Sequence, residues 1–299
     1  MPLRDYVLIL IVIAIWGLNF VLIKIGVAEF PPFLMTSLRF AIVAACVVPF
    51  MAVPWHAMRW LVLLSLTFGS LHFGLLFAAL QSVDGSTGAI LSQLGVPFST
   101  LLAAVFLRDR LGPWRTAGLV LAFFGAAVLA GEPRLPAVGP FVLLVVSAFG
   151  WALSNMYIRK VADVHPLAVT GWISLLALPQ TILWSAVFED GQIAAMRDAS
   201  WMAWGALLYI AVLASMLAYS LWYHLLGKHP VNHVVPFTLL APVLGVVASA
   251  VLLDEPLTWY KLIGGALTIA GVGTILVRQG RSAPVVPPEV EPVAGTPRS

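Results

Sequence analysis

Charged side chains are scarce in this sequence. Of its 299 residues only 10% are Asp, Glu, Lys or Arg, whereas 61% are hydrophobic. A soluble domain usually carries about 25% charged residues, because they cover its water-facing surface. Too few charges are present here for that, so lipid is expected to surround much of the chain. The net charge of +3 does not indicate nucleic acid as a partner, because the basic residues stand singly between apolar runs.

Two further absences narrow the chemistry. The single cysteine, Cys46, lies in an apolar run, cannot form a disulfide within the chain and accompanies no zinc-ligand spacing. Acidic residues are missing from the middle of the apolar runs, which argues against a carboxylate proton relay and against a metal-dependent membrane hydrolase. His224, His229 and His233 cluster across Pro230 and fit no single helical face. No metal site and no cofactor are therefore expected.

Long apolar runs make up most of the chain. A membrane helix needs about 20 mostly apolar residues, and ten stretches meet this length. We therefore predict an all-α integral membrane protein whose spans are 6–27, 33–52, 59–80, 86–107, 114–131, 138–158, 166–188, 201–223, 232–253 and 259–277. The proline-rich end, 279–299, has no apolar periodicity and is predicted to be a disordered cytoplasmic tail.

The distribution of Lys and Arg predicts the orientation. If the N-terminus is cytoplasmic, three basic residues fall in outer loops, namely Arg134, Arg197 and Lys261. Eleven fall on the inner side, namely Arg4, Arg59, Arg108, Arg110, Arg115, Arg159, Lys160, Lys228, Arg278, Arg281 and Arg298. Because cytoplasmic loops of membrane proteins are enriched in Lys and Arg, both termini are predicted to be cytoplasmic.

The two halves of the chain resemble each other. A shift of 135 residues places Trp16 on Trp151, and a shift of 134 places Pro32 on Pro166. Further along, a shift of 146 pairs Ser92 with Thr238, Gly95 with Ala241, Asp109 with Glu255, Gly118 with Gly264 and Gly125 with Gly271. The sequence therefore predicts a first repeat over 1–131 and a second over 132–278.

Each repeat holds five predicted spans. Because five is odd, the second repeat must enter the membrane upside down relative to the first. Inverted repeats are typical of transporters, in which two pseudo-symmetric halves rock about a site near the midplane of the bilayer. A duplication kept only for packing is the alternative interpretation of the same pattern.

Several motifs resemble a known family. They are Trp16-Gly17-Leu18-Asn19-Phe20 followed by Lys24, then Leu38-Arg39-Phe40, and the related stretches 107–111 (LRDRL) and 253–257 (LDEPL). Together with ten spans, they resemble EamA-type domains of the drug/metabolite transporter superfamily over about residues 4–131 and 135–278. The likeness is strongest to bacterial exporters of amino acids and their metabolites, including the YddG type and the cysteine/O-acetylserine type.

This resemblance implies an inner-membrane protein with a central cavity between the halves and alternating access. It implies a transporter and not an enzyme. The expected partners are a small-molecule substrate and the lipid bilayer, with no nucleic acid, and the chain is expected to be a monomer. The second repeat departs from the family pattern at Ala152, and Ile173 stands where the first repeat has Arg39. Roles are therefore not transferred from one repeat to the other.

Polar and aromatic residues within the spans are the candidates for the substrate site. Their alternative roles are helix–helix hydrogen bonds, snorkelling to the headgroups and interfacial packing. The predicted substrate-binding residues are Trp16, Asn19, Lys24, Arg39, His72, Gln93, Trp151, Asn155 and Tyr219. Pro97 and Pro242 fall inside predicted spans and are expected to bend them, either as gates or as static kinks.

Three other functions stay open. A different cargo, such as a hydrophobic drug or a nucleotide-sugar, fits the same architecture, although a phosphate would favour more buried Arg or Lys than Lys24 and Arg39 supply. A membrane enzyme would need clustered carboxylates, a metal motif or an activated nucleophile. A channel would need a continuous open pore. The pattern favours export of amino acids or related metabolites.

Overall fold

The computed structural model describes residues 1–106, 111–133 and 138–282, and within these residues the chain forms helices and no strands. In these described residues, ten helices are long and apolar enough to cross a membrane, which confirms the ten predicted spans. The protein is therefore an all-α, multi-pass membrane protein. The ten spans are Leu3–Val27, Pro32–Phe50, Trp55–Ser82, Gly85–Phe106, Pro113–Ala130, Val138–Val161, Pro166–Phe188, Trp201–Lys228, Val235–Leu252 and Trp259–Arg278.

Several spans are built from consecutive helical segments. The first half contains α1 (Leu3–Val27), α2 (Pro32–Val47), η1 (Val48–Phe50), η2 (Trp55–Ala57), α3 (Met58–Leu64), η3 (Ser65–Gly74), α4 (Leu75–Ser82), α5 (Gly85–Ser92), α6 (Gly95–Phe106) and α7 (Pro113–Ala130). The second half contains α8 (Val138–Tyr157), η4 (Ile158–Val161), α9 (Pro166–Phe188), α10 (Gln192–Asp198), α11 (Trp201–Leu208), η5 (Tyr209–Leu217), α12 (Ala218–Lys228), α13 (Val231–Val234), η6 (Val235–Leu239), α14 (Leu240–Leu252) and α15 (Trp259–Ser282).

The outer surface of the bundle is apolar. Large hydrophobic side chains such as Phe124, Leu183 and Val251 are exposed along the spans. Water would not solvate such a surface, whereas lipid chains do, so the burial pattern agrees with the low charge content of the sequence. Because lipid offers no hydrogen bonds, the backbone is satisfied within helices.

Two spans contain π-helical segments at equivalent positions of the repeat. The third span is π-helical from Ser65 to Gly74 and the eighth from Tyr209 to Leu217. Well under 1% of residues in soluble proteins are π-helical, and π-bulges occur frequently at functional sites. Their recurrence in the third span of each half indicates a candidate functional site where these two spans meet.

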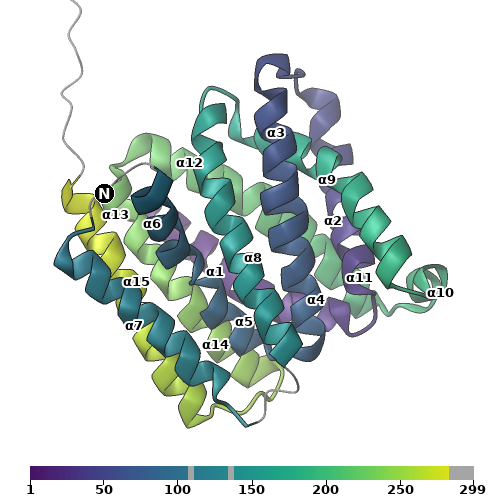
Figure 1. Ribbon diagram of the computed structural model, residues 1–299. Helices are drawn as coiled ribbons and strands as arrows, with labels where there is room; N and C mark the ends of the chain where they lie inside the picture. The colour runs from purple at the N-terminus through teal and green to yellow at the C-terminus, as the bar shows by residue number, and fades with distance from the viewer. Residues whose placement is uncertain (107–110, 134–137, 283–299) are drawn as a thin grey trace, which may run out of the picture.

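Two helix pairs relate the halves to each other. Helices α2 and α9 lie side by side and antiparallel, because Phe33 at the start of α2 packs on Trp184 near the end of α9. At their other end, Gly171 near the start of α9 lies against Val47 at the end of α2. The second pair is α7 and α15, which Figure 1 shows side by side along one edge of the bundle.

Glycines make the contact between α7 and α15 reciprocal. A Cβ added to Gly118 would lie 2.8 Å from the carbonyl oxygen of Gly271, and one added to Gly271 would lie 2.5 Å from that of Gly118. Gly125 and Gly264 face each other likewise, at 2.6 and 2.7 Å. Gly264 is the repeat equivalent of Gly118, and Gly271 that of Gly125. Each glycine therefore contacts the repeat equivalent of the other glycine on its own helix. The order of contacts makes the two helices antiparallel, as inversion of the second repeat requires.

The ends of the spans fall on two faces. The N-terminus and the end of α15 lie on the same face, as an even number of spans demands (Figure 1). On this N-terminal face, Asp5 pairs with Lys228 at 2.9 Å and with His229 at 2.6 Å. The predicted repeat position Asp109 and the tail residues 283–299 lie outside the described residues, while α15 continues to Ser282.

Candidate substrate site

Aromatic rings connect the two halves at the centre of the bundle. Trp16 packs on Tyr219 with ring centroids 5.3 Å apart, and Tyr219 contacts Phe68 at 6.5 Å. Phe68 stacks on His72 at 5.5 Å with an interplanar angle of 8°, and His72 reaches Trp151 at 6.4 Å. The two repeat-equivalent tryptophans thus belong to one chain of contacting rings. We call these five residues, with Phe73, the aromatic cluster.

One π-helical segment supplies rings of this cluster, and the other contacts it. The η3 segment supplies Phe68, His72 and Phe73, and Trp16 Nε1 donates to the carbonyl oxygen of Ala214 in η5 at 3.4 Å. A π-helical turn leaves backbone groups less regularly paired than an α-helical turn, so a side chain can reach them. The cluster therefore lies where the two irregular spans meet.

Arg39 is buried beside the cluster. Its side chain is 4% exposed, its Nε donates to Ser215 Oγ at 3.0 Å, and its guanidinium carbon lies 3.8 Å from the ring centroid of Phe73. Ser215 in turn donates to the carbonyl oxygen of Ile210 at 2.6 Å within η5. The Nη1 atom is buried without a hydrogen-bond partner. A cation held this way can bind an anion.

His72 is held in one orientation by α8. Its Nδ1 lies 3.1 Å from the carbonyl oxygen of Ser147 and 3.0 Å from Ser147 Oγ, and Ser147 Oγ donates to the carbonyl oxygen of His72 at 2.8 Å. Because a carbonyl only accepts, we assign the proton of the neutral ring to Nδ1. The Nε2 atom is then an acceptor on the opposite side of the ring.

A second group of predicted residues surrounds the break between α5 and α6. The Trp151 ring lies so close to Gly95 that a Cβ there would be 1.8 Å from a ring carbon. One turn further along α8, Asn155 Nδ2 donates to Ser99 Oγ in α6 at 3.0 Å. Gln93 caps the C-terminus of α5 through its backbone. This group connects α8 to the interrupted fourth span.

The two predicted kink prolines follow interruptions of their spans. Pro97 is the third residue of α6, just after α5 ends, and Pro242 is the third residue of α14, just after the 3₁₀ segment η6. A proline is tolerated in the first turn of a helix, where its missing N–H is not needed. The interruptions recur at repeat-equivalent positions, which is a common feature of transporter folds. A gating role for either proline stays a prediction.

Two predicted residues lie away from the cluster contacts. Lys24 Nζ donates to the carbonyl oxygens of Leu80 and Val83 at 2.9 Å each and of Gln81 at 3.3 Å. It therefore caps the C-terminus of α4, where a cation also complements the helix dipole. Asn19 Oδ1 is buried without a hydrogen-bond partner. The geometry gives Lys24 a structural contact and leaves Asn19 able to accept a hydrogen bond.

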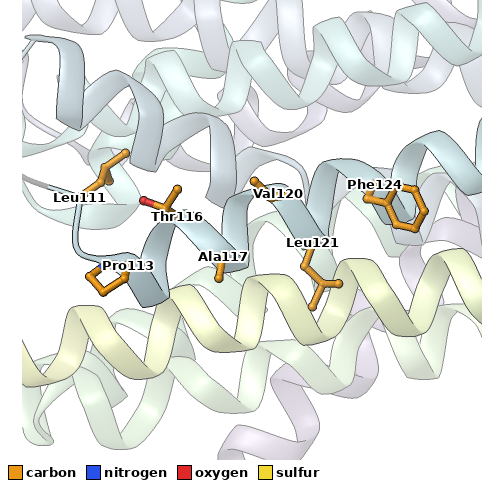
Figure 2. A pocket seen from close by; sticks show the side chains of 7 residues that line it. All are labelled: Leu111, Pro113, Thr116, Ala117, Val120, Leu121 and Phe124. Carbon is orange, nitrogen blue, oxygen red and sulfur yellow. The ribbon is translucent and has the colours of Figure 1, made fainter.

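Two hollows on the described residues lie away from the centre. One hollow, about 610 Å³, runs along α7. Figure 2 shows the side chains that line it, namely Leu111, Pro113, Thr116, Ala117, Val120, Leu121 and Phe124. Val120 and Phe124 are exposed on the outer surface of the bundle. The other hollow, about 490 Å³, opens on the face opposite the N-terminus beside Glu29, Gln81 and Glu189. At the centre the rings of the aromatic cluster pack against each other.

Sequence reasoning missed four residues of the site. Phe68, Phe73, Ser147 and Ser215 contact the predicted residues directly but carry no motif of their own. Phe68 stands four residues before His72, and this spacing could have pointed to it. Ser147 and Ser215 belong to other spans, and nothing in their sequence neighbourhood indicates these contacts.

Comparisons with known proteins agree with this architecture. The chain matches the profile of the EamA-like transporter family twice, over residues 3–131 and 140–277. It is 33% identical to a "Probable amino-acid metabolite efflux pump" of Salmonella typhimurium, covering 91% of this chain and 94% of that protein. It is 30% identical to the protein of the same name in Escherichia coli K12, with the same coverage.

A solved crystal structure shares the fold. It superposes with a TM-score of 0.62 over 93% of this chain and 99% of that chain, at 19% sequence identity. At that identity the likeness speaks for the fold alone.

Proposed function

Because this chain belongs to the EamA-like transporter family, we propose that it exports amino acids and related small metabolites by alternating access. The observation that carries the proposal is the aromatic cluster with Arg39, which joins both repeats where their π-helical spans meet. Rings offer apolar and stacking contacts to a small organic molecule, and a buried cation offers a counter-charge to its carboxylate. The names of the two efflux-pump relatives support the same class of cargo.

Alternating access fits the packing. The cluster lies between the halves, so movement of one repeat relative to the other would expose it first toward one face and then toward the other. We place the protein in the inner membrane with both termini in the cytoplasm, as the eleven-to-three distribution of Lys and Arg favours. Export then runs from the N-terminal face to the opposite one.

Flux through proteoliposomes tests this function. Purified protein should produce saturable efflux of at least one member of a broad panel of amino acids and their metabolites. Trp151→Leu should lower that efflux by about tenfold, because the ring ends the aromatic chain between His72 and Gly95. Trp201→Leu is the matched control, since that tryptophan is 82% exposed at the start of α11.

Two results would contradict the proposal. One is the absence of flux for every member of the panel by protein that is shown to be folded. The other is an equal loss of flux in Trp151→Leu and Trp201→Leu, which would remove the cluster from the transport step.

A further inference from the structure

The charges inside the bundle are unbalanced. Arg39 is 4% exposed, and within the described residues no Asp or Glu lies within ion-pair distance of its guanidinium. An unpaired buried charge is costly, and an arginine cannot relieve the cost by losing its proton. The Nη1 donor is also unused. Arg39 therefore keeps a positive charge and a donor with which it can bind an anion.

The acids of the described residues do not supply that anion. Each lies in a loop or in the first or last turn of a helix, and the buried ones belong to the ends of the bundle. Glu255 accepts hydrogen bonds from the backbone N–H groups of Gly85 and Ser86, at 2.7 and 3.0 Å. Asp5 is paired with Lys228 and His229. A ligand is left as the source of negative charge beside Arg39.

The unpaired positive charge of Arg39 also disfavours a second, positively charged group on the ligand. An α-ammonium group bound in the cluster would find no carboxylate among the described residues, and it would add positive charge beside Arg39. The neutral His72 ring carries no negative charge, so it does not balance Arg39. A zwitterion would therefore gain a counter-charge at its carboxylate and none at its ammonium, whereas a monoanion has no second charge to remove from water.

We infer that the preferred substrate is a monocarboxylate whose amino group is absent or acylated and whose remainder is apolar or aromatic, bound with its carboxylate on Arg39. The Nη1 donor binds a carboxylate oxygen while Nε stays on Ser215. The rings of Phe68, Phe73 and Trp151 surround the apolar remainder. This inference rests on the proposed function and names the chemical class of its cargo.

A matched set of four compounds tests the inference in proteoliposomes. They are 3-phenylpropionate, N-acetyl-L-phenylalanine, L-phenylalanine and phenethylamine, which share the ring and differ in charge. The first two should be transported about tenfold faster than phenylalanine at equal concentration, and phenethylamine should not be transported. Binding is measured separately, as the rise in thermal unfolding temperature caused by each compound. Faster transport of phenylalanine than of the two monoanions would overturn the inference.

Variants at Arg39 test the position. Arg39→Gln should abolish both transport and thermal stabilisation by 3-phenylpropionate, and Arg39→Lys, which keeps the charge, should restore part of both. Arg197→Gln is the control, since that side chain is exposed and pairs with its neighbour Asp198. Unchanged binding of 3-phenylpropionate by folded Arg39→Gln would overturn the assignment. If Arg39→Gln does not fold, the four-compound comparison on the unaltered protein decides.

The test separates the inference from the proposed function. If free amino acids are transported and the monoanions are not, the inference fails and the export function stands. If neither the four compounds nor the broader panel is transported, the export function itself fails.

Discussion

At the scale of single residues, carboxylates act mainly across helices. Glu189, at the end of α9, accepts from the backbone N–H groups of Phe33 and Leu34 at 2.6 and 3.0 Å. Glu29 accepts from the backbone N–H and the hydroxyl of Ser200, both at 2.6 Å. Acids at helix N-termini satisfy unpaired N–H groups and complement the helix dipole. These contacts tie together spans that are distant in sequence.

The Glu29 contact predicts a pH-dependent stability. Hydrogen bonds from the Ser200 hydroxyl and backbone N–H lower the pKa of the Glu29 carboxyl in the folded protein. Because the folded-state pKa is depressed, the stabilisation is present above the unfolded-state pKa of about 4.3 and is lost as pH falls through the folded-state pKa. Glu29→Gln should therefore unfold at a lower temperature than the unaltered protein near neutral pH, with the difference shrinking in acid.

Thermal unfolding of the purified protein at several pH values checks this. Asp190→Asn is the control, because Asp190 is an exposed acid on the same face. A difference between Glu29→Gln and the unaltered protein that stays constant from neutral to acidic pH would show that the charge on Glu29 does not matter.

Residue-level prediction from the sequence succeeded unevenly. Rare polar and aromatic groups within apolar spans predict one shared site. The structure brings five of these residues together, namely Trp16, Arg39, His72, Trp151 and Tyr219. Whether they bind substrate stays a prediction. Lys24 is predicted with these residues because its depth along the first span can be read from the sequence. The direction in which its side chain leaves the helix cannot be read in the same way. Its donors bind carbonyl oxygens at the end of α4.

At the scale of helices, the packing of α7 on α15 depends on the absence of side chains. Gly125→Leu should destabilise the protein by about 1–3 kcal/mol, the usual cost of overpacking. The added Cβ would lie 2.5 Å from Thr268 Oγ1 and 2.6 Å from the backbone oxygen of Gly264, so the helices must separate. Gly205→Leu is the matched control in α11, where a Cβ meets nothing within 4 Å.

Unfolding in a denaturing detergent measures both variants. Equal stability of the two would mean that the close approach of α7 and α15 contributes nothing, and the reciprocal glycine contact would lose its energetic meaning.

Hydropathy predicted the spans because the bilayer imposes a length, and a length is visible in one sequence. The π-helical segments were not predicted. Their residues, such as Ser65 to Gly74, are ordinary helix formers in lipid, and the extra residue in the turn is stabilised by contacts from other spans. A bond such as Arg39 to Ser215 exists only after both halves have assembled.

At the scale of the whole molecule, inversion predicts where each repeat begins. Leu3 and Val138 open the first spans of the two repeats, and both are almost four-fifths exposed. With Cys46 first replaced by alanine, Leu3→Cys and Val138→Cys should react with a membrane-impermeant maleimide from opposite sides of the bilayer. Asp190→Cys, on the face opposite the N-terminus, should react from the same side as Val138→Cys.

Labelling of intact cells and of inverted vesicles gives the answer. Reaction of Leu3→Cys and Val138→Cys from one side would exclude inversion. The repeat pattern was detectable in the sequence because paired glycines and a paired tryptophan survive in both halves. The packing of the centre was not, because it depends on how rings from four elements meet between the halves.

The π-helical segment η5 also determines the direction in which the side chains after it project from the eighth span. Each residue of an α-helix turns the chain by about 100°. One inserted residue therefore rotates all later side chains about the helix axis by roughly that angle. A relative one residue shorter between Tyr209 and Leu217 would keep a stretch ample for the bilayer. Its equivalent of Tyr219 would nevertheless point away from Trp16. Sequence length, and not only sequence identity, therefore determines whether such a relative could form the contact between these two rings.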